Sequence, residues 1–358
     1  MRQIGWVVVA AAAVVSGAAC RREAATAPRV ALLLPESKTA RYETQDWPHF
    51  RARLTALGMK PDDILYGNAN QDPLAQRTQA EAALANGARV LVLDPVDSDA
   101  AAAVADLARA RGVPVVAYDR LIKGTDAVTA YISFDNERVG RLQAEGLLRA
   151  LGGRAGASVV MINGSPTDNN AGMFKRGAHA VLDGKVTVTR EYDTPDWSPD
   201  KAQAQMQQAL TALGNKVDGV YAANDGTAGG VIAALKAAGV SPLPPVTGQD
   251  AELAAIQRIL VGEQALTVYK AIRPEAEAAA ELAFRLATGA LAPAAVANEP
   301  AYRARVDNGR ARVPALLLEP VVVTRANVKD TVIKDGFWKT ADVCSGDTAA
   351  ACRELGIP

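Results

Sequence analysis

The stretch VVMINGSPTDNNAG, residues 159–172, joins a short apolar run to a dense cluster of polar side chains. The apolar part is rich in β-branched residues and lacks alternation, which is typical of a strand buried on both faces of a parallel sheet. Asp168, Asn169 and Asn170 follow it closely. In open parallel sheets, ligands bind beyond the carboxyl ends of the strands. The stretch therefore predicts an α/β fold and a polar binding edge.

The same alternation of apolar runs and Ala-rich segments continues on both sides of this stretch. Asp72 followed by Pro73 favours a helix start, and Gly87 favours its end before the next apolar run. Such a rhythm indicates parallel sheets covered by helices on both faces. We expect strands within residues 89–95, 113–120, 158–163, 185–190, 217–224, 244–250, 265–270 and 316–324, and helices within 73–86, 98–111, 137–151, 171–182, 199–213, 227–238, 252–260 and 273–289.

Length and charge bound the number of domains and the class of partner. A chain of 358 residues exceeds most single cores and favours two domains of about 130 to 170 residues. The 39 Lys and Arg residues balance the 39 Asp and Glu residues, so the chain as a whole does not attract polyanions. We therefore expect no nucleic-acid partner.

The first 20 residues, MRQIGWVVVAAAAVVSGAAC, have the features of an export signal. Cys20 follows Gly17-Ala18-Ala19, which resembles a bacterial lipobox, although Gly17 stands where Leu is usual. We expect lipidation of Cys20, with a plain signal peptide cleaved near Ala19 as the alternative. A membrane-spanning helix is disfavoured because the apolar core is short and Ala-rich. Residues 21–28 are then a tether, and the protein is expected in the periplasm.

The two remaining cysteines, Cys344 and Cys352, lie in a polar tail. In an oxidising compartment we expect them to form a disulfide that closes a small loop. A metal site would need more ligands than His49 and His179 supply. The sequence therefore predicts no metal site, and no motif calls for a cofactor.

Nearly every expected strand ends in polar or aromatic residues. These ends are residues 36–42, 118–120, 168–170, 196–197, 224–225, 249–250 and 269–270. A single Asp or Asn at such a position is ordinarily a helix cap or a turn former. Taken together, the ends bring carboxylates, carboxamides, cations and rings to one edge. That combination suits a neutral polyhydroxylated ligand, because each hydroxyl donates one hydrogen bond and accepts two.

Two aromatic residues occur at these strand ends in a chain with only 5% aromatics. Tyr42 and Trp197 are suited to enclose the apolar face of a pyranose ring. The alternative for Trp197 is packing at the surface beside Pro195 and Pro199.

Several longer motifs identify a family. They are residues 118–147, 162–177, 221–235, 247–259, 264–270 and KDTVIKDGFWK at 329–339. In order and spacing they resemble the periplasmic sugar-binding proteins of ribose-binding-type topology, which serve ABC transporters, and within that family the D-xylose-binding members. The likeness covers roughly residues 30–339.

The resemblance implies the periplasmic binding protein type I fold, with two Rossmann-like lobes and parallel sheets. Three crossovers would form a hinge, near residues 133–136, 271–274 and 316–320, and the ligand would lie in the cleft between the lobes. The expected boundaries are 29–133 plus 272–317 for the N-terminal lobe, 134–271 plus 318–340 for the C-terminal lobe, and 341–358 for a C-terminal extension outside the resemblance.

Carried over position by position, the resemblance implies a set of sugar contacts. They are Arg41, Asp119, Arg120, Asn170, Asn224, Asp250 and Lys270, with Tyr42 and Trp197 as the stacking pair. Asp168 either contacts the sugar or orients Arg120. The family pattern has Trp where this chain has Tyr42, and the loop at residues 35–47 is one residue longer. Lys38 and Asp46 are therefore alternative occupants of the first positions.

The function that the resemblance implies is capture of D-xylose by hinge closure and delivery to the permease of an ABC transporter, by a monomer. D-glucose or another aldose, and a sensory domain reporting to a kinase or chemoreceptor, remain alternatives. An enzyme is disfavoured because no nucleophile motif, phosphate loop or His-centred arrangement is present. A sugar-responsive repressor would need a helix-turn-helix where this sequence has an export signal.

Overall fold

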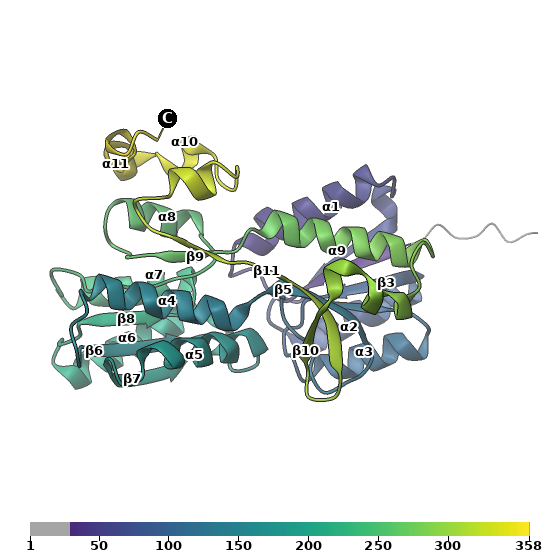
Figure 1. Cartoon of the computed structure of the whole chain (residues 1–358), viewed down its shortest axis with the longest axis horizontal. Helices are drawn as coiled ribbons and strands as arrows, with labels where there is room; N and C mark the ends of the chain where they lie inside the picture. The colour runs from purple at the N-terminus through teal and green to yellow at the C-terminus, as the bar shows by residue number, and fades with distance from the viewer. Residues whose placement is uncertain (1–28, 358) are drawn as a thin grey trace, which may run out of the picture.

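The computed structural model of the chain describes residues 29–357, which form two α/β lobes lying side by side (Figure 1). The expected export signal, the lipidation site at Cys20 and the tether lie outside the described residues. Within the described part, no helix is long and apolar enough to cross a membrane. The expected α/β fold with two lobes is confirmed.

The N-terminal lobe is built on a seven-stranded sheet with the order β10-β11-β5-β4-β3-β1-β2. Its strands are parallel except β10, which pairs with β11 in the antiparallel sense. The strands are β1 (Arg29–Leu34), β2 (Ile64–Asn68), β3 (Ala88–Leu93), β4 (Val115–Tyr118), β5 (Val128–Phe134), β10 (Ala304–Asp307) and β11 (Arg312–Leu318).

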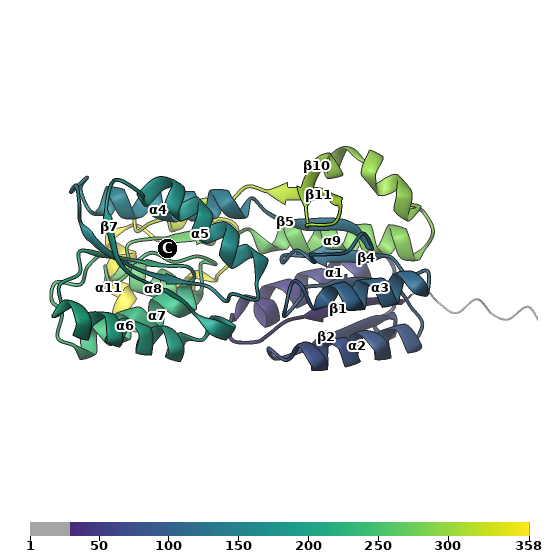
Figure 2. The ribbon, with the colours of Figure 1, turned by 90° about the horizontal axis from the view of Figure 1, so that it is seen from below.

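Helices cover both faces of this sheet, as Figure 2 shows from below. Alternate side chains of β1 point to opposite faces. Leu32 and Leu34 pack with α1 (Trp47–Ala56) and α9 (Ile272–Ala287). Ala31 and Leu33 pack with α2 (Pro73–Ala85) and α3 (Ala101–Ala110). The strand is therefore apolar throughout because both of its faces are buried.

The C-terminal lobe has a three-stranded parallel sheet, β7-β6-β8, and a two-stranded antiparallel sheet, β12-β9. Single bridges at Val246 and Gln249 lie between the two sheets. The elements are α4 (Asn136–Ala150), β6 (Ser158–Asn163), α5 (Asn169–Leu182), β7 (Thr187–Asp193), α6 (Pro199–Leu213), β8 (Gly219–Ala222), α7 (Asp225–Ala237), α8 (Leu253–Leu260), β9 (Thr267–Tyr269), β12 (Val321–Val323), α10 (Thr340–Val343) and α11 (Ala349–Glu354).

The chain passes between the lobes three times, close to the expected crossovers. The passages lie between β5 and α4, between β9 and α9, and between β11 and β12. Figure 1 shows these segments running side by side between the lobes. Because short segments join otherwise separate cores, the lobes have the connection that hinge motion requires.

Two expected strands are wrong. The strand predicted within residues 316–324 is divided, because β11 ends at Leu318 and pairs with β5, whereas β12 begins at Val321 and pairs with β9. Pro320 lies in the break and has no N–H to continue a ladder. The strand predicted within residues 244–250 is reduced to single bridges, and prolines at 244 and 245 account for part of that loss.

The edges of the two lobes touch directly across the cleft. The backbone N–H of Ser98 donates to the carbonyl of Thr167 at 3.0 Å, and the Ser98 hydroxyl accepts from the N–H of Asn169 at 3.1 Å. Farther along, the Gln71 carboxamide donates to the carbonyl of Asp196 at 3.2 Å. The structure is therefore the closed arrangement of the lobes.

Candidate functional site

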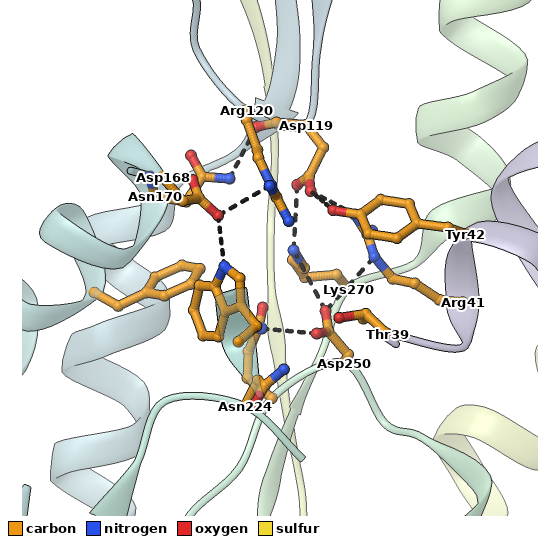
Figure 3. A pocket seen from close by; sticks show the side chains of 13 residues that line it. Thr39, Arg41, Tyr42, Asp119, Arg120, Asp168, Asn170, Asn224, Asp250 and Lys270 are labelled. Atoms are coloured by element: carbon orange, nitrogen blue, oxygen red, sulfur yellow. Dashed lines mark hydrogen bonds and ion pairs between the residues drawn. The ribbon is translucent and has the colours of Figure 1, made fainter. Parts of the chain in front are cut away.

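Every residue that the sequence analysis proposed for sugar binding lines one pocket between the lobes (Figure 3). About 260 Å³ in and around the pocket is not filled by protein atoms, and part of this space is open solvent. The N-terminal lobe supplies Arg41, Tyr42, Asp119 and Arg120, and the C-terminal lobe and its crossover supply Asp168, Asn170, Trp197, Asn224, Asp250 and Lys270. Thr39, Phe174 and Gln249 also line it and were not among the proposed residues.

Strand ends and helix caps place these side chains. Asp168 caps α5 by accepting from the N–H of Asn170 at 2.8 Å. Asn224 caps α7 by accepting from the N–H of Thr227 at 2.9 Å, and the Thr227 hydroxyl accepts from the N–H of Asn224 in return. Capping and pocket lining are thus not alternatives for these residues. A cap holds the side chain at the helix N-terminus, which faces the cleft.

Several pocket residues have an unusual backbone conformation. Asp119, Trp197 and Asp250 have φ values of 52°, 53° and 95°. Left-handed conformations are unfavourable for residues with a side chain and persist where the surrounding structure holds them, which is often at functional sites. Their presence on three of the loops that meet in the cleft marks this edge as specialised.

Asp119 is the centre of a charged cluster. Its Oδ2 lies 2.5 Å from Arg41 Nη2 and accepts from the Tyr42 hydroxyl at 3.1 Å, and its Oδ1 lies 3.3 Å from Lys270 Nζ. Burial opposes ionisation, but Arg41, Lys270 and Arg120 outweigh burial and lower the pKa of Asp119. Asp119 is therefore a carboxylate at neutral pH.

Asp168 joins the two lobes by holding Arg120. Its Oδ2 lies 3.0 Å from Arg120 Nε and accepts from the indole N–H of Trp197 at 3.0 Å. Burial raises the pKa of Asp168 against the opposing effect of Arg120. Asp168 was expected either to contact the sugar or to orient Arg120, and in the structure it holds Arg120.

Asp250 approaches from the opposite wall. Its Oδ1 lies 3.4 Å from Lys270 Nζ and 3.9 Å from Arg41 Nε, and Gln249 donates to its Oδ2 at 2.9 Å. Among the described residues, four buried pocket atoms have no hydrogen-bond partner of suitable geometry: Arg41 Nη1, Arg120 Nε, Gln249 Oε1 and Asp250 Oδ1. Buried polar groups are normally paired. Arg41 Nη1 faces Asp46 and Glu275 at 3.7 Å, and Arg120 Nε faces Asp168 at 3.0 Å. Gln249 Oε1 and Asp250 Oδ1 are therefore the acceptors that a ligand hydroxyl can use as a donor.

The aromatic side chains lie on opposite sides of these charges. Tyr42 is buried, and the guanidinium carbon of Arg41 is 4.6 Å from the centre of its ring. Trp197 is buried and packs edge to face on Phe174, with ring centres 6.3 Å apart. Phe174 lies inside α5 and gave no strand-end signal. In sequence it looks like a core residue of a helix.

The alternative occupants of the first loop do not line the pocket. Lys38 is exposed. Asp46 is fully buried behind Arg41, where it lies 3.7 Å from Nη1 and accepts from the Tyr118 hydroxyl at 2.6 Å. Arg41 and Tyr42, rather than Lys38 and Asp46, therefore line the pocket from the first loop.

A second layer of buried carboxyl groups surrounds the cations. Glu36 and Asp94 lie 3.9 Å and 3.6 Å from Arg120, and Glu275 lies 3.7 Å from Arg41. Burial raises the pKa of Asp94 and of Glu275 well above the usual range. Neither Asp94 nor Glu275 was among the residues predicted from the sequence. Within residues 29–357 no cluster of His, Cys, Asp and Glu could hold a metal ion.

Comparisons with known proteins agree with this geometry. The family described as "Periplasmic binding protein domain" matches residues 30–291. The D-xylose-binding periplasmic protein of Escherichia coli K12 is 38% identical over 320 residues, which cover 88% of this chain and 92% of that protein. The multiple sugar-binding periplasmic protein SbpA of Azospirillum brasilense is 37% identical over 334 residues, 88% of this chain and 90% of that protein.

A solved structure extends the likeness to three dimensions. It is an ABC transporter solute binding protein from Clostridium phytofermentans with bound β-D-glucose. The TM-score is 0.80 at 30% identity, and the match covers 88% of this chain and 99% of that chain. The similarity therefore includes both lobes and the cleft between them.

Proposed function

Because this chain belongs to the periplasmic binding protein family, we propose that it is an extracytoplasmic receptor that captures a monosaccharide and delivers it to an ABC transporter permease. It is a binding protein rather than an enzyme, in line with its relatives. The observation that carries the proposal is one interlobe pocket of the described chain that gathers carboxylates, cations, carboxamides and aromatic rings, and in which the acceptors Gln249 Oε1 and Asp250 Oδ1 have no hydrogen-bond partner.

Sugar hydroxyls suit these groups because each hydroxyl both donates and accepts. The carboxylates of Asp119 and Asp250 would accept from hydroxyls, and Arg120, Lys270 and Asn224 would donate to hydroxyl or ring oxygens. Hydrogen bonds to charged groups contribute about 1.5–3 kcal/mol each. The rings of Trp197 and Phe174 would cover the apolar face of the sugar on one side, with Tyr42 on the other.

D-xylose is the proposed ligand. The E. coli relative is named for D-xylose. D-glucose is the main alternative, because the solved structure from C. phytofermentans holds it. The two sugars differ by one hydroxymethyl group, and a pocket discriminates such a difference by about 1–3 kcal/mol.

Closure of the lobes would present a surface that the permease recognises, as in hinge-closing binding proteins generally. In the sugar-bound state, the ring would replace the direct approach of Arg41 to Asp250 across the pocket. We further propose that the receptor acts as a monomer in the periplasm and is anchored there through a lipid on Cys20.

Titration calorimetry with a panel of sugars tests the proposal. The protein, started just after Cys20, is titrated with D-xylose, D-glucose, D-ribose and L-arabinose, and with sucrose as a control that is too large for the pocket. We expect one-to-one binding of D-xylose tighter than about 1 mM, or about 4 kcal/mol, and no heat from sucrose. Binding of D-glucose in preference to D-xylose would support the receptor function but identify D-glucose as the ligand. Absence of binding to any of the monosaccharides would contradict the receptor function.

A further inference from the structure

The chain after β12 forms a cap on the C-terminal lobe, defined here as residues 325–357 and coloured yellow-green to yellow above α8 in Figure 1. Its buried residues share one apolar cluster with α8 and β9. Within it, Phe337 packs edge to face on Tyr269, with ring centres 5.0 Å apart, and on Trp338 at 5.3 Å. The cap therefore touches the residue that precedes Lys270.

The indole of Trp338 also reaches a strained turn beside the pocket. Its N–H donates to the carbonyl of Ala251 at 2.7 Å. On the other side of that residue, the N–H of Ala251 donates to the Thr267 hydroxyl at 3.1 Å. Ala251 and its neighbour Asp250 have φ values of 52° and 95°. Two successive left-handed residues with side chains persist only where such contacts hold them.

This turn determines where the carboxylate of Asp250 points. Asp250 lines the pocket, and its Oδ1 is buried without a hydrogen-bond partner in the described chain, 3.4 Å from Lys270 Nζ. The carbonyl of Phe337 accepts from Gln45 of the N-terminal lobe at 3.2 Å, and Gln45 lies in the same turn as Tyr42, Tyr42–Asp46. The cap thus contacts pocket-lining segments of both lobes without lining the pocket itself.

We propose that Trp338 is a positioning residue for the sugar site: its indole N–H holds the left-handed turn at Asp250 and Ala251 and so aims the Asp250 carboxylate at the ligand. This inference rests on the proposed sugar-receptor function. Trp338 acts through the backbone of Ala251 and makes no contact with the sugar.

A double-mutant cycle tests the positioning role. Trp338→Phe keeps a ring in the half-buried cluster and removes the N–H, and we expect it to weaken D-xylose binding at least fivefold in calorimetry. In an Asp250→Ala background the same substitution should add less than a twofold loss, because the group that it positions is absent. Ala251→Gly should restore part of the affinity to Trp338→Phe, since glycine adopts the left-handed conformation readily. Trp47→Phe, which alters a tryptophan stacked on Tyr66 outside the pocket, is the control and should bind normally.

Hydrogen exchange gives a readout that needs no sugar. In Trp338→Phe the amides of residues 249–253 should exchange faster than in the wild type, and in Trp47→Phe they should not. If the wild type binds sugar, and Trp338→Phe shows the same affinity and the same amide exchange as the wild type, the role proposed for Trp338 is overturned while the receptor function stands. A wild type that binds no monosaccharide would overturn the receptor function and the binding role together, whereas faster exchange would still support Trp338 as the holder of the turn.

Discussion

The most informative residues of this chain are charged and buried. Arg41, Arg120 and Lys270 are almost fully shielded from solvent, and each approaches at least one carboxylate that lines the pocket. Charged groups in such surroundings require partners, because an unpaired buried charge is strongly destabilising. A ligand that supplies the missing hydrogen bonds therefore gains affinity from atoms that are otherwise unsatisfied.

Removal of one charged partner should weaken sugar binding severely. Arg120→Ala and Asp250→Ala are each expected to lower the affinity for D-xylose by about 2 kcal/mol or more, roughly 30-fold, because each leaves charged groups unpaired in a closed pocket. Calorimetry on the purified variants measures the change. Arg77→Ala removes an exposed arginine paired with Glu81 and should bind like the wild type. Wild-type affinity in either pocket variant would contradict the site.

A second prediction concerns Asp225, which lies beneath the pocket. Its carboxylate accepts from Gln264 at 2.7 Å and from Thr267 at 2.9 Å, but burial raises its pKa from 3.8 to about 7. Between these two pH values the folded state retains a proton that the unfolded state has released. The free energy of unfolding should therefore fall as the pH rises through this window, by at most about 1.4 kcal/mol per pH unit.

Urea unfolding measures this effect. The wild type and Asp225→Asn are compared at pH values of about 4.5, 6 and 8, which span the window between the two pKa values. The stability of the wild type relative to the variant should decrease as the pH rises across this range. Asp200→Asn, at an exposed position in the first turn of α6, is the control and should show no such trend. A difference that does not change with pH would show that Asp225 is ionised in the folded protein throughout.

At the scale of elements, the strand ends and the crossovers between the lobes were predicted well, whereas two strands were not. Residues at strand ends could be predicted because Asp, Asn and Lys that recur after successive apolar runs are typical of a binding edge in a parallel sheet. Phe174 and Glu275 could not, because both lie in helices, where an aromatic or acidic side chain alone does not reveal which way it faces. Residues 316–324 form two strands instead of the one expected, because the end of a strand depends on which strand it pairs with. The local sequence does not reveal that partner.

The C-terminal cap is the element for which the sequence offered least. Its first part, up to residue 340, was expected in the C-terminal lobe, residues 341–358 were expected as an extension outside the resemblance, and the two cysteines were expected to pair. In the structure Cys344 and Cys352 are joined, and Cys352 is buried in the cluster that contains Val343 and Ile357. The extension is therefore packed onto the C-terminal lobe rather than separate from it. This packing arises from tertiary contacts that composition does not reveal.

The disulfide should stabilise this cap. It closes a loop with a sequence separation of 8 residues, for which chain entropy gives about 2.5 kcal/mol. Replacement of both cysteines by alanine should lower the free energy of unfolding of the C-terminal lobe by about that amount, as measured in urea with and without a reducing agent. The reducing agent should destabilise the wild type and leave the variant unchanged. Equal stability of the two proteins under oxidising conditions would contradict a structural role.

At the scale of the whole molecule, the closed arrangement brings Arg120 of one lobe against Asp168 of the other while several buried polar atoms of the described chain stay unpaired. Without a ligand, opening of the lobes would let water reach those atoms. We expect small-angle X-ray scattering to give a larger radius of gyration for the sugar-free protein than for the protein with saturating D-xylose. Sucrose should leave the scattering unchanged. Identical curves with and without D-xylose would contradict hinge closure.

The crystal structure of the protein grown with D-xylose tests the central claim most directly. The account predicts one sugar ring between the lobes, with hydroxyls on Asp250, Arg120 and Lys270 and the ring of Trp197 against its apolar face. Gln249 Oε1 and Asp250 Oδ1 should then have hydrogen-bond partners. Electron density for the sugar outside this pocket, or a pocket still closed by direct contact of Arg41 with Asp250, would contradict it.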